Sequence, residues 1–338
     1  MLRFLVRRSL WAAVLFVSVT IVTYVIFFLA PANPERLICG GQRATTACLN
    51  EVADTLALDR PIYVQYSKFL WRLVGPTTSD VAGIPIPHPR FDLGESFITE
   101  QSVNTIVAKA APVTAALVFG GAILWLLVGL SAGIFSALRP RSLLDRTSMV
   151  FVLIGISAHP VWLGLIFSYF FGFKLGLTPI TGYCDFFNPA EGFGCGGPVD
   201  WAHHMILPWI SFAIIGAALY VRMIRANVMD TMNEDYVRTA RAKGAPERQV
   251  MRSHILRNAL LPVVTMLGMD IGLGLGGAVF TETVYSLPGL GRVAVQAVDN
   301  YDLPIVQGVV VFSTAAIILF NLVVDVLYAW IDPRIRLE

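Results

Sequence analysis

Six long apolar stretches constrain the fold of this 338-residue chain more than any other feature. Hydrophobic residues make up 56% of the sequence and charged residues only 14%, whereas a soluble globular chain is about one quarter charged. A helix needs about 20 apolar residues to cross the hydrocarbon core of a bilayer. We therefore predict an all-α integral membrane protein with six transmembrane helices. The stretches lie at residues 9–30, 113–138, 147–173, 205–221, 259–281 and 303–324.

The first apolar stretch follows a basic N-terminus, "MLRFLVRR", and a cleaved signal peptide can begin in the same way. Ala30-Pro31-Ala32 loosely resembles a cleavage site. However, the apolar run is longer than the core of about 7–15 residues that signal peptides have. We favour an uncleaved first transmembrane helix and keep the cleaved signal peptide as the alternative.

The distribution of Lys and Arg predicts how the helices are oriented, because cytoplasmic segments are enriched in these residues. With the N-terminus inside, most of the 25 Lys and Arg residues lie on the cytoplasmic side. The short loop "RPRSLLDR" at residues 139–146 shows this clearly. We therefore expect both termini in the cytoplasm.

All four cysteines then lie on the outer side of the membrane, where an oxidising environment favours disulfides. Cys39 and Cys48 follow the first helix, and Cys184 and Cys195 follow the third. Two local bridges, Cys39–Cys48 and Cys184–Cys195, suit this arrangement. Four free thiols remain the alternative, because spacing does not determine pairing.

Residues 31–107 are too polar for the membrane and predict a small extracytoplasmic domain. Two amphipathic helices are expected there, on either side of Pro61, and "GPTTSDVAGIPIPHPR" reads as a loop rich in Pro and Gly. The predicted organisation is a tail and first helix at 1–30, this domain at 31–107, and a membrane core at 108–338.

A basic segment, "NEDYVRTARAKGAPERQVMRSHILRNALLP", separates the fourth and fifth apolar stretches. Glu234 and Asp235 suit the positive end of a helix, Gly244 can end that helix in a left-handed conformation, and Pro246 can begin the next one. A solvated loop would also be basic, but a helix, a break and a second helix favour a docking element.

This segment resembles the cytoplasmic loop of permeases from the oligopeptide/dipeptide/nickel family of ABC importers. "YVRTARAKG" carries the resemblance, together with "LDRPIYVQY", "DLGESFITEQSV", "GAVFTETVYSLPGLGRVAVQAVDNYDLPIVQG" and "NLVVDVLYAWIDPRIR". The likeness runs along the whole chain and is closest to the first of the two permeases that such importers pair. It implies the type I ABC-importer permease fold.

The resemblance further implies that residues 225–258 form a coupling loop that docks on an ATPase subunit. The expected coupling residues are Glu234, Asp235, Tyr236, Arg238, Ala240, Lys243 and Gly244. The implied partners are a second permease, two ATP-binding cassette ATPases, an extracytoplasmic binding protein and membrane lipid, with no nucleic acid. No cofactor is expected in this chain, because ATP and Mg²⁺ would bind the ATPases. The expected location is the plasma membrane of a bacterium or archaeon.

The fifth apolar stretch holds the candidate residues for a translocation path. An ionisable residue within a membrane helix, here Asp270, indicates function by default, although a hydrogen bond between helices is the alternative. Glycines four residues apart permit close helix approach, either within the subunit or along a path. The candidates are Asp270, Gly272, Gly276 and Glu282.

Two common catalytic motifs are missing from the sequence, the phosphate-binding G-x-x-x-x-G-K-[ST] and the metal-binding H-E-x-x-H. We expect a translocation subunit that is not an enzyme, and no metal site. The favoured substrate class is di- or oligopeptides. Nickel, glutathione or another small solute, and an ATP-independent channel or secondary transporter, remain alternatives.

Overall fold

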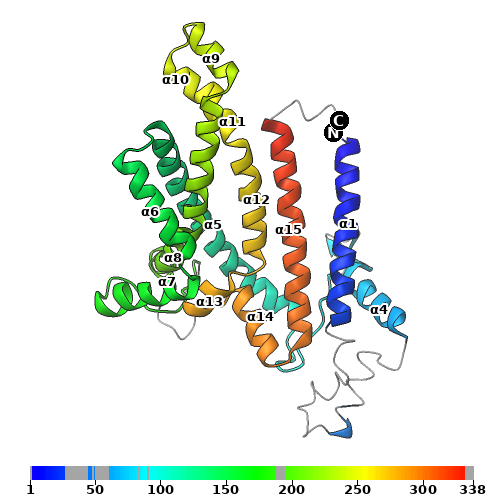
Figure 1. Ribbon diagram of the computed structural model, residues 1–338. Helices are drawn as coiled ribbons and strands as arrows, with labels where there is room; N and C mark the ends of the chain where they lie inside the picture. Colours follow the sequence, from blue (N-terminus) through cyan, green and yellow to red (C-terminus); the bar gives the residue numbers. More distant parts are fainter. Residues whose placement is uncertain are drawn as a thin grey trace. The chain divides into compact units, whose positions relative to one another are not determined.

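The computed structural model describes residues 2–26, 45–47, 49, 61–81, 84–89, 91–187 and 195–331, which are mostly helical (Figure 1). Internal contacts divide the chain into two compact units. The first comprises Met1–Ala111 with Val293–Ile318, and the second comprises Pro112–Arg292 with Leu319–Glu338. The division predicted at residues 30 and 107 concerns membrane topology and stays a prediction.

Two helices of the first unit, α1 (Leu2–Tyr24) and α4 (Ile62–Val74), pack through aromatic rings. The Tyr24 ring centroid lies 5.7 Å from that of Tyr66 and 5.9 Å from that of Phe69. Phe69 and Leu73 are buried, which confirms the predicted apolar face of α4. Most of the other predicted amphipathic helix, near residues 49–56, lies outside the described residues.

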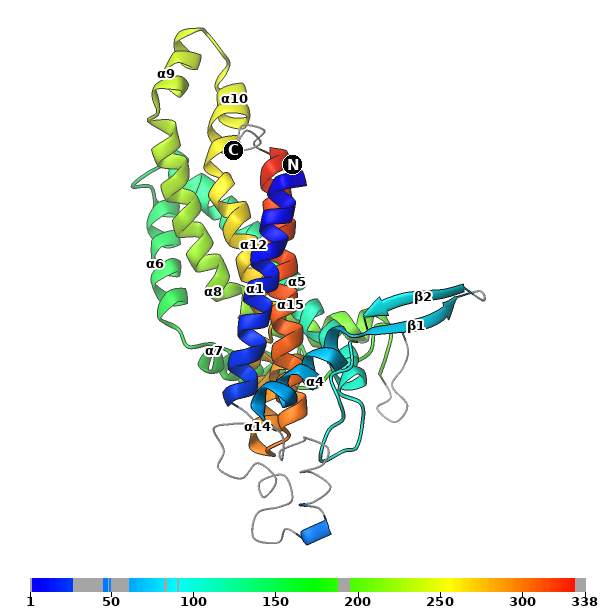
Figure 2. The same ribbon diagram turned by 90° about the vertical axis from the view of Figure 1, so that its right-hand side faces the viewer.

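The segment after α4 forms a β-hairpin, so the interpretation of "GPTTSDVAGIPIPHPR" as a loop is wrong. Strands β1 (Pro76–Val81) and β2 (Ile84–Pro89) pair antiparallel (Figure 2). Three prolines alternate along β2 and face Pro76, Thr78 and Asp80 in the register. Alternate residues of an antiparallel pair do not exchange hydrogen bonds, so prolines two apart can all occupy such positions. Proline content alone therefore did not exclude a strand.

The second unit contains most of the apolar helices. The long helices α5 (Val103–Leu138) and α15 (Leu303–Ile331) each contribute to both units. The other helices of the second unit are α6 (Leu143–Ser157), α7 (Pro160–Phe167), the π-helical η3 (Ser168–Lys174), α8 (Pro198–Met232), α12 (Leu261–Leu275) and α13 (Val279–Val284), and α14 (Leu290–Asp299) begins there.

A break at His159-Pro160 divides the third predicted helix into two parts that are bent by 106°. Pro160 lacks the N–H that would continue the helical hydrogen bonds, and the His159 ring accepts a hydrogen bond from the Val161 N–H at 3.3 Å. The imidazole is thus satisfied by capping α7, but the single span expected at 147–173 is broken.

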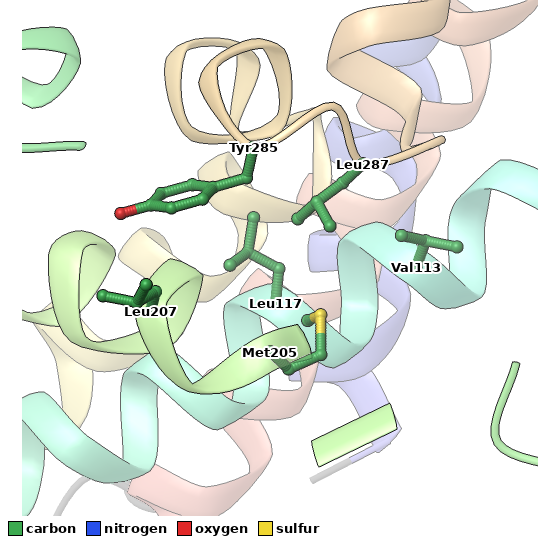
Figure 3. Packing of buried hydrophobic residues seen from close by; sticks show 6 residues of the cluster. All are labelled: Val113, Leu117, Met205, Leu207, Tyr285 and Leu287. Atoms are coloured by element: carbon green, nitrogen blue, oxygen red, sulfur yellow. The ribbon is translucent and has the colours of Figure 1, made fainter. Parts of the chain in front are cut away.

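The buried core of the second unit joins α5 to α8 and to the turn after α13 (Figure 3). Leu117 and Met205 interdigitate there with Tyr285 and Leu287, and all four side chains are at least 98% buried. Close helix packing also needs glycine at certain positions. A Cβ at Gly268 would overlap the Val324 side chain of α15, so this glycine serves packing within the subunit.

Three to five membrane spans can be assigned among the described residues. By length and composition α5, α8 and residues Leu303–Val324 can each cross a membrane, and two bent helix pairs raise the number to five. The apolar part of α1, Leu10–Tyr24, is shorter. The helical class is confirmed, and the count of six spans stays a prediction.

Candidate functional site

The basic segment predicted as a docking element forms two short helices beyond the ends of α8 and α12 (Figures 1 and 2). Helix α9 (Asp235–Ala242) follows α8 after a turn, and α10 (Glu247–Gln249) leads through the π-helical η4 (Val250–Leu256) and α11 (Arg257–Ala259) back to α12. The predicted sequence of helix, break and second helix is present.

Gly244 ends α9 in the left-handed conformation, with φ of +78°. The Gly244 N–H donates to the Arg241 carbonyl at 2.9 Å, and the Ala245 N–H donates to the Ala240 carbonyl at 3.2 Å. These two bonds form a Schellman motif, which satisfies the last carbonyls of a helix and favours glycine. A Cβ at Gly244 would meet no atom within 4 Å. Within this chain the need for glycine is therefore conformational.

One side of α9 anchors the loop to the segment that follows it. Val237 is fully buried. The Tyr236 hydroxyl accepts a hydrogen bond from Asn258 Nδ2 at 2.8 Å and donates to the His254 carbonyl at 3.4 Å. Tyr236, predicted to face an ATPase, thus also holds α9 against η4 and α11. These contacts give the loop a defined shape.

The exposed surface of α9 and the turn after it carries charges of both signs. Arg241 and Glu247 form a two-point ion pair across the turn, with Nη2–Oε1 and Nε–Oε2 distances of 2.7 and 3.1 Å. The hydrogen bond to Glu247 raises the pKa of Arg241 above its usual value, so the guanidinium stays charged. Glu234, Asp235, Arg238 and Lys243 are exposed as well. This surface offers charged groups that no buried contact uses.

Asp270, the candidate in the membrane segment, lies half-buried on α12 and faces α8. The Tyr220 hydroxyl donates to Asp270 Oδ2 at 2.7 Å, so the hydrogen bond between helices that the sequence left open is present. Asp270 also lines a cavity of about 430 Å³. The other three path candidates, Gly272, Gly276 and Glu282, do not line this cavity.

Glu282 is fully buried and holds the turn "SLPGLGR" in place. Its Oε1 accepts hydrogen bonds from Thr114 Oγ1 at 2.8 Å and from the Ala278 N–H at 3.3 Å, and its Oε2 accepts one from the Arg292 N–H at 3.0 Å. Thr114 Oγ1 in turn accepts from the Leu290 N–H at 2.8 Å. The carboxylate therefore organises the turn from inside.

Asp145 and Arg225 form a buried network that the sequence analysis did not identify. Arg225 Nε and Nη2 donate to Asp145 Oδ1 and Oδ2 at 2.7 and 3.1 Å. Ser136 Oγ and the Arg141 N–H also donate to this carboxylate. The one local signal was an acid within the basic loop "RPRSLLDR". Its partner Arg225 is 80 residues away, and nothing in the sequence pattern pairs the two.

The predicted bridge between Cys184 and Cys195 is confirmed, while Cys39–Cys48 lies outside the described residues. The part of the chain that the structure describes contains one group of three potential metal ligands, formed by these two cysteines and His204. Both sulfurs are bonded to each other, so neither is a thiolate. His204 Nδ1 also lies 2.8 Å from the Asp200 carbonyl.

Most of the chain matches two known sequence families of membrane transport components. Residues 129–337 match the binding-protein-dependent transport system inner membrane component family, and residues 1–118 match the N-terminal family of the same systems. This chain therefore belongs to the inner membrane components of binding-protein-dependent transport systems. It is a multi-pass protein of the inner membrane and the permease component of a transporter, not an enzyme.

Several curated relatives match along almost their full length. The di/tripeptide transport system permease DppB of Pseudomonas aeruginosa is 35% identical over 353 residues, covering 99% of each chain. The dipeptide transport system permease DppB of Escherichia coli is 34% identical over 351 residues, again covering 99% of each. A putative peptide transport system permease of Brucella abortus is 33% identical over 334 residues.

A solved structure supports the fold. An inward-facing form of the MetNI methionine ABC transporter matches with a TM-score of 0.53 and 18% identity, over 68% of this chain and 97% of that chain. The ABC-importer permease fold expected from the sequence is therefore confirmed.

Proposed function

We propose that this chain is one of two paired permeases in an ATP-driven importer of di- and oligopeptides. An extracytoplasmic binding protein delivers the peptide, and two ATPase subunits bind the loop formed by α9 and α10. The second permease and the two ATPases are the partners that this proposal requires. The names of the relatives support peptides as the substrate class.

The observation that carries this proposal is the construction of α9. Its inner side is tied to the segment after it by Val237 and Tyr236, and its outer side presents Arg238 and Lys243. An element that transmits motion from an ATPase to a membrane helix must be held rigidly on the side of that helix. Its other side must be accessible to the ATPase. Closure of the ATPases then shifts the permease pair between two discrete states.

The orientation with both termini in the cytoplasm belongs to the same proposal. It places α9 on the side where ATP is available, and it places β1, β2 and the bridge between Cys184 and Cys195 outside. The excess of Lys and Arg in the segment between α8 and α12 supports it.

Reconstitution with the neighbouring permease, ATPases and binding protein tests the proposal. Proteoliposomes should take up labelled alanyl-phenylalanine with ATP and the binding protein, and not without either. Uptake that needs no ATPase would favour a channel or secondary transporter. Transport of Ni²⁺ or glutathione, with no uptake of any peptide, would contradict peptides as the substrate class. The proposal of an ATP-driven importer would still stand.

A further inference from the structure

The cavity beside Asp270 is apolar, with residues of α5, α7, α8, α12 and α13 around it. It measures about 430 Å³, which lies in the range of small-molecule sites, about 300–1,000 Å³. Most lining residues are aromatic, aliphatic or glycine, including Trp125, Phe212, Leu219 and Phe280. Such a lining can bury an apolar side chain.

Asp270 is the one ionisable residue among those that line this cavity. Its hydrogen bond from Tyr220 is neutral, and no ion pair to Asp270 occurs among the described residues. A carboxylate in apolar surroundings is stabilised by a cation, and an ammonium group that leaves water needs such an anion. The charge of the cavity is therefore complementary to a protonated amine.

Trp125 forms part of the wall of this cavity. Its side chain lines the cavity, the residue is 4% exposed, and its indole Nε1 is buried with no hydrogen-bond partner in the described part of the chain. The ring packs 5.7 Å from Phe212 and 5.9 Å from Tyr220 between centroids. Because this nitrogen has almost no accessible surface, the part of Trp125 that borders the cavity is apolar ring.

We infer that this cavity is a subsite for the amino end of a peptide during its passage, which rests on the proposed function. The Asp270 carboxylate accepts hydrogen bonds from the α-ammonium group. The apolar lining receives a side chain. The carboxylate and the lining match two neighbouring features of one peptide end.

The competing explanation is that Asp270 only joins α12 to α8 through Tyr220. Two substitutions separate the explanations. Asp270→Asn keeps an oxygen that can accept from Tyr220 but removes the charge, while Tyr220→Phe removes the hydrogen bond but keeps the carboxylate. If Asp270 serves only to join the helices, Tyr220→Phe should lower uptake as much as Asp270→Asn does. If Asp270 binds an ammonium group, Asp270→Asn should lower uptake and Tyr220→Phe should not.

The complete transporter should be reconstituted in vesicles of phosphatidylcholine and phosphatidylglycerol, so that no lipid offers a primary amine. Uptake of alanyl-phenylalanine and the ATPase rate that the binding protein stimulates are measured together. Asp270→Asn should lower uptake at least about tenfold, because it removes a charge-assisted hydrogen bond, and leave the ATPase rate within about twofold. Tyr220→Phe and the control Asp299→Asn, which alters an exposed acid, should retain uptake.

A substrate without the amino group provides a second test in case Asp270→Asn does not fold. The unmodified transporter should take up propionyl-phenylalanine several-fold more slowly than alanyl-phenylalanine, because this analogue offers no ammonium group to Asp270. The des-amino analogue propionyl-phenylalanine gives a further comparison, since its transport should not distinguish Asp270→Asn from the unmodified chain.

Equal uptake by Asp270→Asn and the unmodified transporter would overturn the subsite. Parallel loss of uptake and ATPase activity in both Asp270→Asn and Tyr220→Phe would assign Asp270 to helix packing and overturn it too. Failure of the unmodified transporter to take up any peptide would instead contradict the proposed function.

Discussion

Arg225 on α8 holds Asp145 near the start of α6 through two hydrogen bonds, of 2.7 and 3.1 Å. Asp145 is 5% exposed, and Ser136 of α5 binds the same carboxylate. The Asp145 carboxylate therefore connects three helices, α5, α6 and α8. Asp145→Ala should lower the free energy of unfolding by about 3 kcal/mol, since it leaves a mostly buried guanidinium without its partner. Thermal unfolding of the purified chain in detergent measures this.

The control for this prediction is Asp235→Ala, since Asp235 pairs with Arg238 at 3.6 Å on the exposed surface of α9. Its loss should cost less than about 1 kcal/mol. The double variant Asp145→Ala with Arg225→Ala should be more stable than the sum of the two single losses predicts, because no unpaired charge remains. Equal unfolding of Asp145→Ala and the unmodified chain would contradict the anchoring role.

Glu282→Gln should loosen the turn at residues 286–292. The amide keeps the shape of the carboxylate, but its NH₂ group must face an N–H or hydroxyl donor that the carboxylate now satisfies. We expect a loss of about 2 kcal/mol in the free energy of unfolding. Glu95→Gln, at an exposed position, is the control. Hydrogen exchange of the Leu290 and Arg292 backbone amides should become faster in this variant. Unchanged exchange rates would argue against this role.

Gly244→Asp tests the coupling loop, and Gly176→Asp is its matched control. Both glycines have positive φ, +78° and +61°, and a Cβ at either would meet no atom within 4 Å. The backbone strain is therefore similar, about 1 kcal/mol. Gly244→Asp should insert normally but lose co-purification of the ATPases and lose uptake, because a tenfold loss of affinity needs only about 1.4 kcal/mol. Gly176→Asp should keep both.

Full ATPase recovery and full uptake in Gly244→Asp would reject the coupling role. Equal losses in the two variants would assign the effect to strain alone.

Thiol labelling with a membrane-impermeant reagent tests the orientation. A single cysteine that replaces Ser79 in β1 should react from outside, and cysteines that replace Ser142 or Ser253 should react only after the membrane is opened. Reaction of the Ser253→Cys variant in intact cells would invert the topology. It would also separate α9 from any cytoplasmic ATPase.

Peptide mapping without reduction tests the cysteine pairs. We expect Cys184 linked to Cys195, as in the structure, and Cys39 linked to Cys48, as the sequence predicts. Each bridge closes a short loop and should contribute roughly 2–3 kcal/mol in the chain-entropy view. A peptide that joins Cys39 to Cys184 would disprove the local pairing of the first two cysteines.

Local sequence patterns predicted what depends on a few neighbouring residues. The apolar stretches correspond to helices, and Gly244 ends α9 as its position before Pro246 indicated. The break at His159-Pro160 also has a local cause, because proline removes a helical donor wherever it stands. The size of that break, 106°, is not a local property, since it depends on how α6 and α7 each pack against α8. The hairpin after α4 was missed because proline-rich strands and proline-rich loops have similar compositions.

The sequence by itself determined the membrane class, the positions of the helices and the family, because hydrophobic length, capping and motif spacing act within one segment of chain. Only the tertiary structure decided which polar side chains meet. Tyr220 binds Asp270 across 50 residues, and Thr114 binds Glu282 across 168. Each pairing depends on which faces of two distant helices turn toward each other. That choice is set by the packing of all helices in the unit at once, and no single segment specifies it.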